Sequence, residues 1–144
     1  QASHFTTELV VRYKKKNERR AYNAICLSSD TALLTAISND YDFNKIFSRQ
    51  LEGLANSKDL LFLFSTSGNS KNLIEAVKYA KSTKSKIFGI VGHNGGYTRK
   101  NSNCCIRVPL VDKKLITPYT EAYQAVVWHC IVSHPKLQEN KTKW

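Results

Sequence analysis

The sequence lacks any apolar stretch of the roughly 20 residues that a membrane-spanning helix needs. Its start, QASHFTTELV, also lacks the basic segment and the long apolar segment of a secretory signal peptide. The 144 residues include 42% hydrophobic side chains, which is enough for the core of one domain. We therefore expect a single domain over residues 1–144, located in the cytoplasm and without a membrane partner.

Cysteine is scarce, and its spacing excludes the common cysteine motifs. The four cysteines form no CxxC pair and no zinc-finger pattern. Cys104 and Cys105 are adjacent, whereas Cys26 and Cys130 stand alone in apolar runs. This arrangement favours buried, reduced thiols over a disulfide framework, in agreement with a cytoplasmic location.

Acidic residues are few, with 11 Asp and Glu against 22 Lys and Arg, so that the formal net charge is +11. Such a charge is compatible with nucleic-acid binding. The basic residues are spread along the chain, however, and the one dense run, KKKNERR at 14–20, has no interleaved aromatic residues. A solvated loop and a general attraction for anionic small molecules are favoured, and we expect no nucleic-acid partner. Direct nucleic-acid binding stays as an alternative.

Short apolar segments alternate with helical patterns along the chain. The expected strands are 21–28, 59–65, 86–92 and 104–109, and the expected helices are 4–13, 31–38, 44–55, 70–82 and 118–133. Ser28, Ser29 or Asp30 would cap the second helix, and Thr117 would cap the last one, with Pro118 at its first position. Because the strands are apolar without a period of two, we predict an α/β fold: a doubly wound parallel sheet with helices on both faces.

A cluster of hydroxyl residues follows the expected strand 59–65, in the stretch FSTSGNSKN at 64–72. Ligands bind beyond the carboxyl ends of strands in such sheets, and the backbone N–H groups of a helix start attract anions. Gly68 allows the backbone to approach a ligand closely. No Gly-Lys-Ser/Thr follows, so the pattern favours one phosphate on a small molecule over a nucleotide. A hydroxyl-rich helix cap is the alternative.

Polar residues on two other helices are candidates for chemistry. His4, Glu8 and Arg12 are spaced i, i+4 and i+8, which also fits a solvated helix face. His129 lies in the apolar context QAVVWHCIV, where the pattern alone favours a hydrogen-bonded core histidine. Glu121 lies two turns before it, on roughly the same side of the helix. The spacing alone leaves these alternatives open.

Four segments carry a family resemblance: HFTTELVVRY (4–13), residues 27–54, LFSTSGNSKNLIEAVKYAK (63–81) and IRVP (106–109). Together they resemble the sugar isomerase (SIS) domain family, and within it the phosphoheptose isomerases. The resemblance implies an aldose–ketose isomerase that converts sedoheptulose 7-phosphate to D-glycero-D-manno-heptose 7-phosphate through an enediol. It also implies a homo-oligomer, a tetramer in that family, that serves heptose synthesis for surface polysaccharide.

The same resemblance implies the roles of particular residues. Glu8 and His129 would be catalytic. Substrate contacts would come from Ser65, Thr66, Ser67, Ser70, Arg12, Asp40 and Glu121. One zinc ion per subunit would be held by His4, Glu8, Glu121 and His129, a ligand set of the N and O donors that zinc accepts.

The chain also departs from the family pattern. It starts inside the early helix, so we expect it to lack the N-terminal helix, the first strand and the glycine-rich loop of the family. Glu121 stands where the family usually has glutamine. Residues 110–120 also lack the particular acidic residue that the family normally has shortly before that glutamine. The functional alternative is a non-catalytic SIS module that binds a phosphosugar or a protein partner, such as a replication initiator. The presence of both Glu8 and His129 favours the enzyme.

Overall fold

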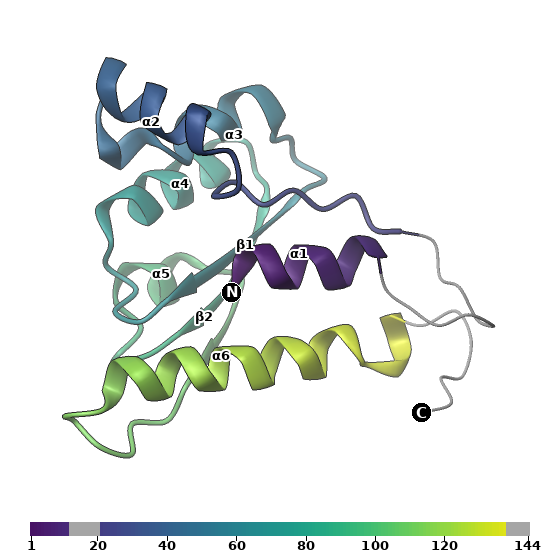
Figure 1. Ribbon diagram of the computed structural model, residues 1–144, viewed down its shortest axis with the longest axis vertical. Helices are drawn as coiled ribbons and strands as arrows, with labels where there is room; N and C mark the ends of the chain where they lie inside the picture. The colour runs from purple at the N-terminus through teal and green to yellow at the C-terminus, as the bar shows by residue number, and fades with distance from the viewer. Residues whose placement is uncertain (12–20, 138–144) are drawn as a thin grey trace.

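The computed structural model describes residues 1–11 and 21–137 (Figure 1). The helices are α1 (Ala2–Val11), α2 (Thr31–Asp40), α3 (Ser48–Leu54), α4 (Lys71–Ser82), α5 (Gly96–Asn101) and α6 (Ile116–Val132), with short 3-10 helices η1 (Phe43–Lys45) and η2 (Pro135–Leu137). The strands are β1 (Leu60–Ser65), β2 (Lys86–Val91) and β3 (Cys104–Arg107). Arg12 and the basic run 14–20 lie outside the described residues.

The three strands form one parallel sheet in the order β1-β2-β3. Ser65 pairs with Val91, and Val91 pairs with Arg107, so the three strands end together. The chain segments that follow these residues therefore share one edge of the sheet, where ligands bind in α/β folds.

Both faces of the sheet are covered by helices, as the unbroken apolar runs predicted. Along β1, Phe62 and Phe64 pack against the cluster that contains Phe5 of α1 and Trp128 of α6. The alternate residues, Leu61 and Leu63, pack on the opposite side, against buried residues of α4. Successive side chains of a strand point to opposite faces, so a strand buried on both sides has no polar position. The predicted α/β class with helices on both faces is confirmed.

The capping residues decide where two helices begin. The carboxylate of Asp30 accepts a hydrogen bond from the N–H of Leu33 (2.9 Å), which confirms the predicted cap of α2. The predicted start of α6 is wrong, because the helix begins at Ile116 and the residue before it makes no side-chain cap. Pro118 is then the third helical residue. It is tolerated there because the first N–H groups of a helix have no intrahelical acceptor.

The predicted strand over 21–28 is wrong. Residues 21–26 have no regular structure, and Tyr22 donates its N–H to the carbonyl of Leu9 in α1 (3.2 Å). Figure 1 shows this segment running beside α1 toward α2 rather than along a strand. Ile25 is 60% exposed there. An apolar run becomes a strand only where a sheet edge is in reach, and this segment pairs with none.

The thiols differ in part from expectation. No disulfide joins the four cysteines, but Cys104 and Cys130 are exposed, so the prediction of buried thiols is wrong for these two. Cys104 lies on the edge strand β3, and Cys130 lies on the outer side of α6.

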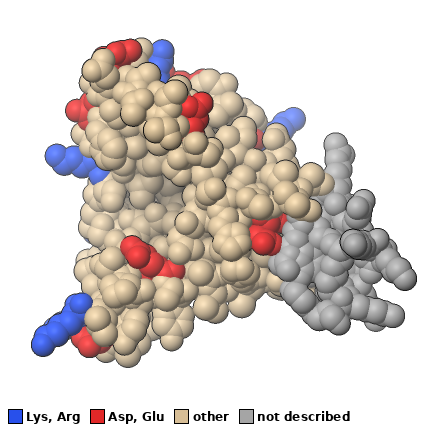
Figure 2. Space-filling view, viewed as in Figure 1, with Lys and Arg blue, Asp and Glu red and all other residues tan. Residues whose placement is uncertain are grey.

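The charged side chains are dispersed. In Figure 2, Lys and Arg stand mostly at the margins of the face that carries α1 and α6. None of the described helices combines the length and the apolar character needed to cross a membrane.

Candidate functional site

The loop Ser65–Ser70 connects the end of β1 to the start of α4. The hydroxyl of Ser65 accepts a hydrogen bond from the N–H of Gly68 (2.9 Å), and that of Ser67 accepts one from the N–H of Asn69 (3.1 Å). Each of these hydroxyls keeps its own hydrogen to donate. Ser70 precedes α4 but its side chain makes no capping bond, so the alternative of a hydroxyl-rich helix cap gains no support at this residue. The loop thus gathers O–H donors at the sheet edge.

Helix α5 braces this loop from the side. Thr98 is fully buried and donates both its N–H (3.0 Å) and its hydroxyl (3.1 Å) to the carbonyl of Gly68. Tyr97 donates its N–H to the side-chain oxygen of Asn69 (2.9 Å). Gly68 has a φ of +70°, and a Cβ there would lie 2.0 Å from the carbonyl oxygen of Gly95. Only glycine fits at position 68, and these hydrogen bonds hold the loop against α5.

A second group of functional side chains lies on α1 and α6, which run side by side over one face of the sheet (Figure 1). One possible metal-ligating atom from each of His4, Glu8 and His129 lies within 4.8 Å of the other two. Nε2 of His4 is 3.5 Å from Oε1 of Glu8, one turn along α1. We call these three residues the His–Glu–His cluster.

Neighbouring groups orient His129. Its Nδ1 lies 2.8 Å from the carbonyl oxygen of Ala125, which only accepts hydrogen bonds, so Nδ1 carries the hydrogen. In the neutral ring Nε2 then keeps its lone pair for a metal or a proton. The ring also stacks on Trp128, with centroids 3.7 Å apart. His129 is exposed, so the interpretation as a core histidine is wrong.

The cluster matches the chemistry of a zinc site in its donors. Two imidazole nitrogens and one carboxylate oxygen are a common set for catalytic zinc, with the fourth position open to water or substrate. The hydrogen bond from His129 to a backbone carbonyl is the second contact that metal-binding histidines usually make. The residues present therefore fit the metal that the family resemblance implies.

Two predicted site residues, Glu121 and Asp40, belong neither to this cluster nor to the Ser65–Ser70 loop. Glu121 is exposed, and its carboxylate is not among the grouped ligand atoms; two turns, roughly 12 Å, separate it from His129 along α6. Asp40 is the exposed last residue of α2, and its carboxylate accepts a hydrogen bond from Asn39 (2.9 Å). Arg12 lies outside the described residues.

Two residues of α6 that were not predicted as site residues make specific hydrogen bonds. Gln124 is only 2% exposed and donates from Nε2 to the carbonyls of Ile90 (2.9 Å) and Ser65 (3.3 Å). Trp128 is 1% exposed and donates its Nε1–H to the side-chain oxygen of Gln1 (2.8 Å). The sequence held one signal of such a role: Gln124 is a polar amide directly before the apolar run 125–128 of the expected helix.

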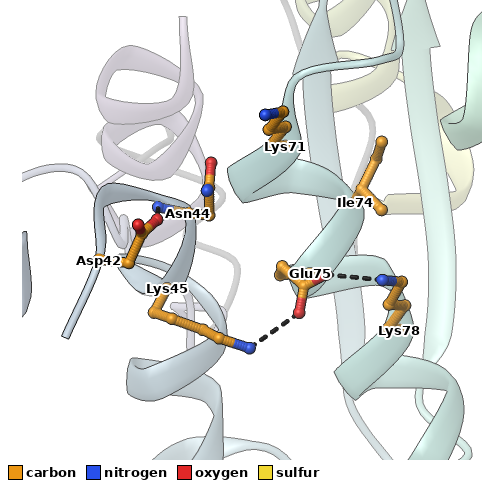
Figure 3. Close-up of a pocket in the computed structure, with 7 residues that line it drawn as sticks. All are labelled: Asp42, Asn44, Lys45, Lys71, Ile74, Glu75 and Lys78. Carbon is orange, nitrogen blue, oxygen red and sulfur yellow. Dashed lines mark hydrogen bonds and ion pairs between the residues drawn. The ribbon is translucent and has the colours of Figure 1, made fainter.

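A groove of about 420 Å³ lies between η1 and α4, apart from the cluster (Figure 3). Glu75 lies at its centre and pairs with Lys78 (2.7 Å) and Lys45 (2.9 Å). The hydrogen bond from Lys78, and then that from Lys45, lower the pKa of Glu75, and the same carboxylate raises the pKa of Lys78. The Lys45–Glu75 pair ties η1 to α4, the helix that follows the Ser65–Ser70 loop, whereas the Lys78–Glu75 pair lies within α4.

Comparison with known proteins places the chain in a family. The model of the SIS domain matches residues 3–92, which include the Ser65–Ser70 loop and all of α1 but its first residue. The chain belongs to the SIS domain family.

The relatives of this SIS domain carry a consistent name. A phosphoheptose isomerase of Leptospira biflexa is 46% identical over 108 residues, covering 75% of this chain and 55% of the relative. One from Helicobacter pylori is 41% identical over 133 residues, covering 92% and 64%. Phosphoheptose isomerase 1 of Campylobacter jejuni is 41% identical over 137 residues, covering 95% and 68%. The chain therefore spans between 55% and 68% of the length of these relatives.

Solved structures agree with the sequence comparison. The phosphoheptose isomerase of Francisella tularensis matches with a TM-score of 0.74 and 32% identity, covering 91% of this chain and 66% of its own. That of Neisseria gonorrhoeae matches with a TM-score of 0.75 and 31% identity, covering 91% and 67%. The predicted membership of the SIS family is confirmed, and the fold of this SIS domain is that of the phosphoheptose isomerases.

Proposed function

We propose that this SIS domain is a phosphoheptose isomerase that converts sedoheptulose 7-phosphate to D-glycero-D-manno-heptose 7-phosphate. One observation carries the proposal: α1 and α6, from opposite ends of the chain, bring His4, Glu8 and His129 together within 4.8 Å. Relatives with up to 53% identity over the aligned residues, and solved structures with the same fold, carry the name phosphoheptose isomerase.

The Ser65–Ser70 loop would hold the phosphate of the sugar. Hydroxyls of Ser65, Thr66, Ser67 and Ser70, with the N–H groups at the start of α4, are donors suited to phosphate oxygens. No lysine belongs to the loop itself, so binding would rest on these neutral donors and on the general attraction of a +11 chain for anions. A loop already braced by Thr98 loses little freedom on binding.

Glu8 and His129 would move the proton. Aldose–ketose isomerisation removes a proton from one carbon and returns it to its neighbour through an enediol, while a second group handles the proton on oxygen. Glu8 supplies a carboxylate base and His129 an imidazole whose Nε2 is directed by the Ala125 contact. The stack on Trp128 holds that ring in place.

We further propose that His4, Glu8 and His129 bind one zinc ion, which would take the place of the proton on Nε2 of His129. Bound zinc would polarise the sugar carbonyl and stabilise negative charge on its oxygen. The donor types and the orientation of His129 support this assignment. Glu121, the fourth ligand that the family resemblance implies, stays a prediction.

Assembly and location complete the proposal. We propose a homo-oligomer, a tetramer as in the family, working in the cytoplasm in heptose synthesis for surface polysaccharide. Tyr119, Tyr123 and Val126 lie at i, i+4 and i+7 on α6 and are 37%, 47% and 56% exposed, an apolar stripe suited to burial. The four free thiols agree with a reducing compartment.

The test is incubation of the full-length protein with sedoheptulose 7-phosphate, with and without a chelator, followed by identification of the product. We expect the aldoheptose 7-phosphate to form, a chelator to slow its formation and added zinc to restore it. Binding of the substrate without any conversion would overturn the proposal in favour of a non-catalytic SIS module.

A further inference from the structure

We propose that Gln124 is a positioning residue, which joins α6 to the phosphate-binding loop so that both move as one unit. This inference rests on the function proposed above. Gln124 lies on the side of α6 that faces the sheet, whereas His129 lies on an exposed side of the same helix. A contact made by Gln124 with the loop therefore connects the two parts of the proposed site through a single helix.

The contact of Gln124 involves both hydrogens of one amide nitrogen. Nε2 lies 2.9 Å from the carbonyl oxygen of Ile90 in β2 and 3.3 Å from that of Ser65 in β1. Ser65 is the last residue of β1 and the first of the loop. The same carbonyl also accepts the N–H of Gly92 (3.2 Å), so the end of β1, the end of β2 and α6 meet at this oxygen.

A second contact, one turn earlier on α6, also joins this helix to the ends of β1 and β2. Thr120 is 1% exposed and packs where Gly92 has no side chain. A Cβ on Gly92 would lie 2.2 Å from Oγ1 of Thr120 and 2.8 Å from the carbonyl oxygen of Thr66. Thr120 of α6 and the carbonyl of Thr66 in the loop therefore both lie close to Gly92, with no room for a side chain there.

Because the amide of Gln124 is buried, its two hydrogen bonds matter for stability. An amide hidden from water loses its hydration, and it regains that free energy only through bonds of the kind that Gln124 makes. Replacement by methionine keeps the length and removes both donors. The carbonyls of Ser65 and Ile90 then lose one donor each, and the end of β1 gains freedom relative to α6.

The experiment compares Gln124→Met with Gln50→Met in the full-length protein. Gln50 is a matched control, because its Nε2 also donates to two backbone carbonyls, those of Leu27 (2.9 Å) and Ile46 (2.6 Å), far along the chain from the loop. Two readouts are measured: amide hydrogen exchange at Gly68 and Gly92, and the separate values of kcat and KM for sedoheptulose 7-phosphate.

We expect Gln124→Met to speed exchange at Gly68 and Gly92 and to lower kcat by roughly 10- to 100-fold, with a smaller change in KM, because a misplacement of about 1 Å between substrate and catalytic groups has that effect. Gln50→Met should leave both readouts near the wild-type values. Gln124→Asn, which keeps the amide but is one methylene shorter, should change both in the same direction by less, and it serves if the methionine variant does not fold.

Unchanged exchange at Gly68 and Gly92 in a folded Gln124 variant would overturn the inference, as would equal effects of the Gln124 and Gln50 substitutions. If the wild-type protein isomerises no sugar phosphate, the proposed function fails. The exchange readout still decides in that case whether Gln124 holds the loop.

Discussion

The rings of His4 and His129 stand edge to face, with centroids 5.4 Å apart at 89°. His4 lies near the start of the described chain and His129 near its end, and both rings contact Trp128. The proposed chemistry therefore depends on how α1 packs beside α6 rather than on any local motif. The following substitutions test that arrangement.

Replacing Glu8 with glutamine should remove turnover and leave the fold intact. The two side chains have nearly the same shape, but the amide cannot act as a base, so kcat should fall by roughly 100- to 10,000-fold. Turnover of sedoheptulose 7-phosphate and a thermal melt would be measured together. Glu52→Gln, the same change at an exposed residue of α3, is the control. Full activity of Glu8→Gln would end the catalytic assignment.

Zinc affinity should depend on His129. We expect His129→Gln to weaken zinc binding by more than about 10-fold, because it removes one of the three clustered donors. Calorimetric titration of the metal-free protein with zinc measures the change. His134→Gln alters an exposed histidine outside the cluster and should bind zinc like the wild type. Equal affinity in both variants would contradict the zinc proposal.

Two glycine-to-alanine substitutions should have opposite effects on stability. Gly68→Ala places a Cβ 2.0 Å from a backbone oxygen at a φ of +70°, and should cost about 1–3 kcal/mol and raise KM by distorting the loop. Gly53 in α3 has nothing within 4 Å of such a Cβ, and Gly53→Ala should stabilise the helix by about 0.5–1 kcal/mol. Denaturant titration tests both. A stabilised Gly68→Ala would refute the described loop.

The ion pairs of Glu75 should make stability depend on pH in the acidic range. Because Lys78 and Lys45 lower its pKa in the folded protein, the ionised form contributes stability that is present at neutral pH. That contribution is lost as the pH falls from the ordinary glutamate value, about 4.3, through the lowered one.

Glu75→Gln should accordingly destabilise the protein by about 0.2–1 kcal/mol at pH 7, the range for exposed ion pairs. The difference from wild type should vanish at acidic pH and shrink in high salt. Melting temperatures measured from neutral to acidic pH provide the test. A difference between the two proteins that does not change with pH would show that the charge of Glu75 has no part in it.

The regular core of the fold was predictable from local sequence. β1, α4 and β2 came within a residue or so of the expected ranges, because each is an apolar or amphipathic run with distinct ends. The prediction for segment 21–28 was wrong for a non-local reason: the segment has the composition of a strand, yet it pairs with none of the strands in the described part of the chain. The predicted start of α6 was wrong because Pro118 fits the third helical position as well as the first.

The candidate site was only partly predictable. The phosphate loop is a continuous motif and could be located directly, whereas the closeness of Glu8 and His129 came from family resemblance, since spacing cannot place two distant helices together. Gln124 escaped notice because glutamine in a helix usually faces water, and only the packed structure shows that its amide is buried. The role of Arg12 and that of Asp40 stay predictions.

The indole of Trp128 gives the protein a built-in optical reporter. It touches both imidazoles, and the chain has only one other tryptophan, Trp144, which lies outside the described residues. An imidazole quenches the emission of a neighbouring indole to a degree that changes with its protonation or metal binding. In a Trp144→Phe background, fluorescence would therefore follow events at His4 and His129 in real time, without any attached dye.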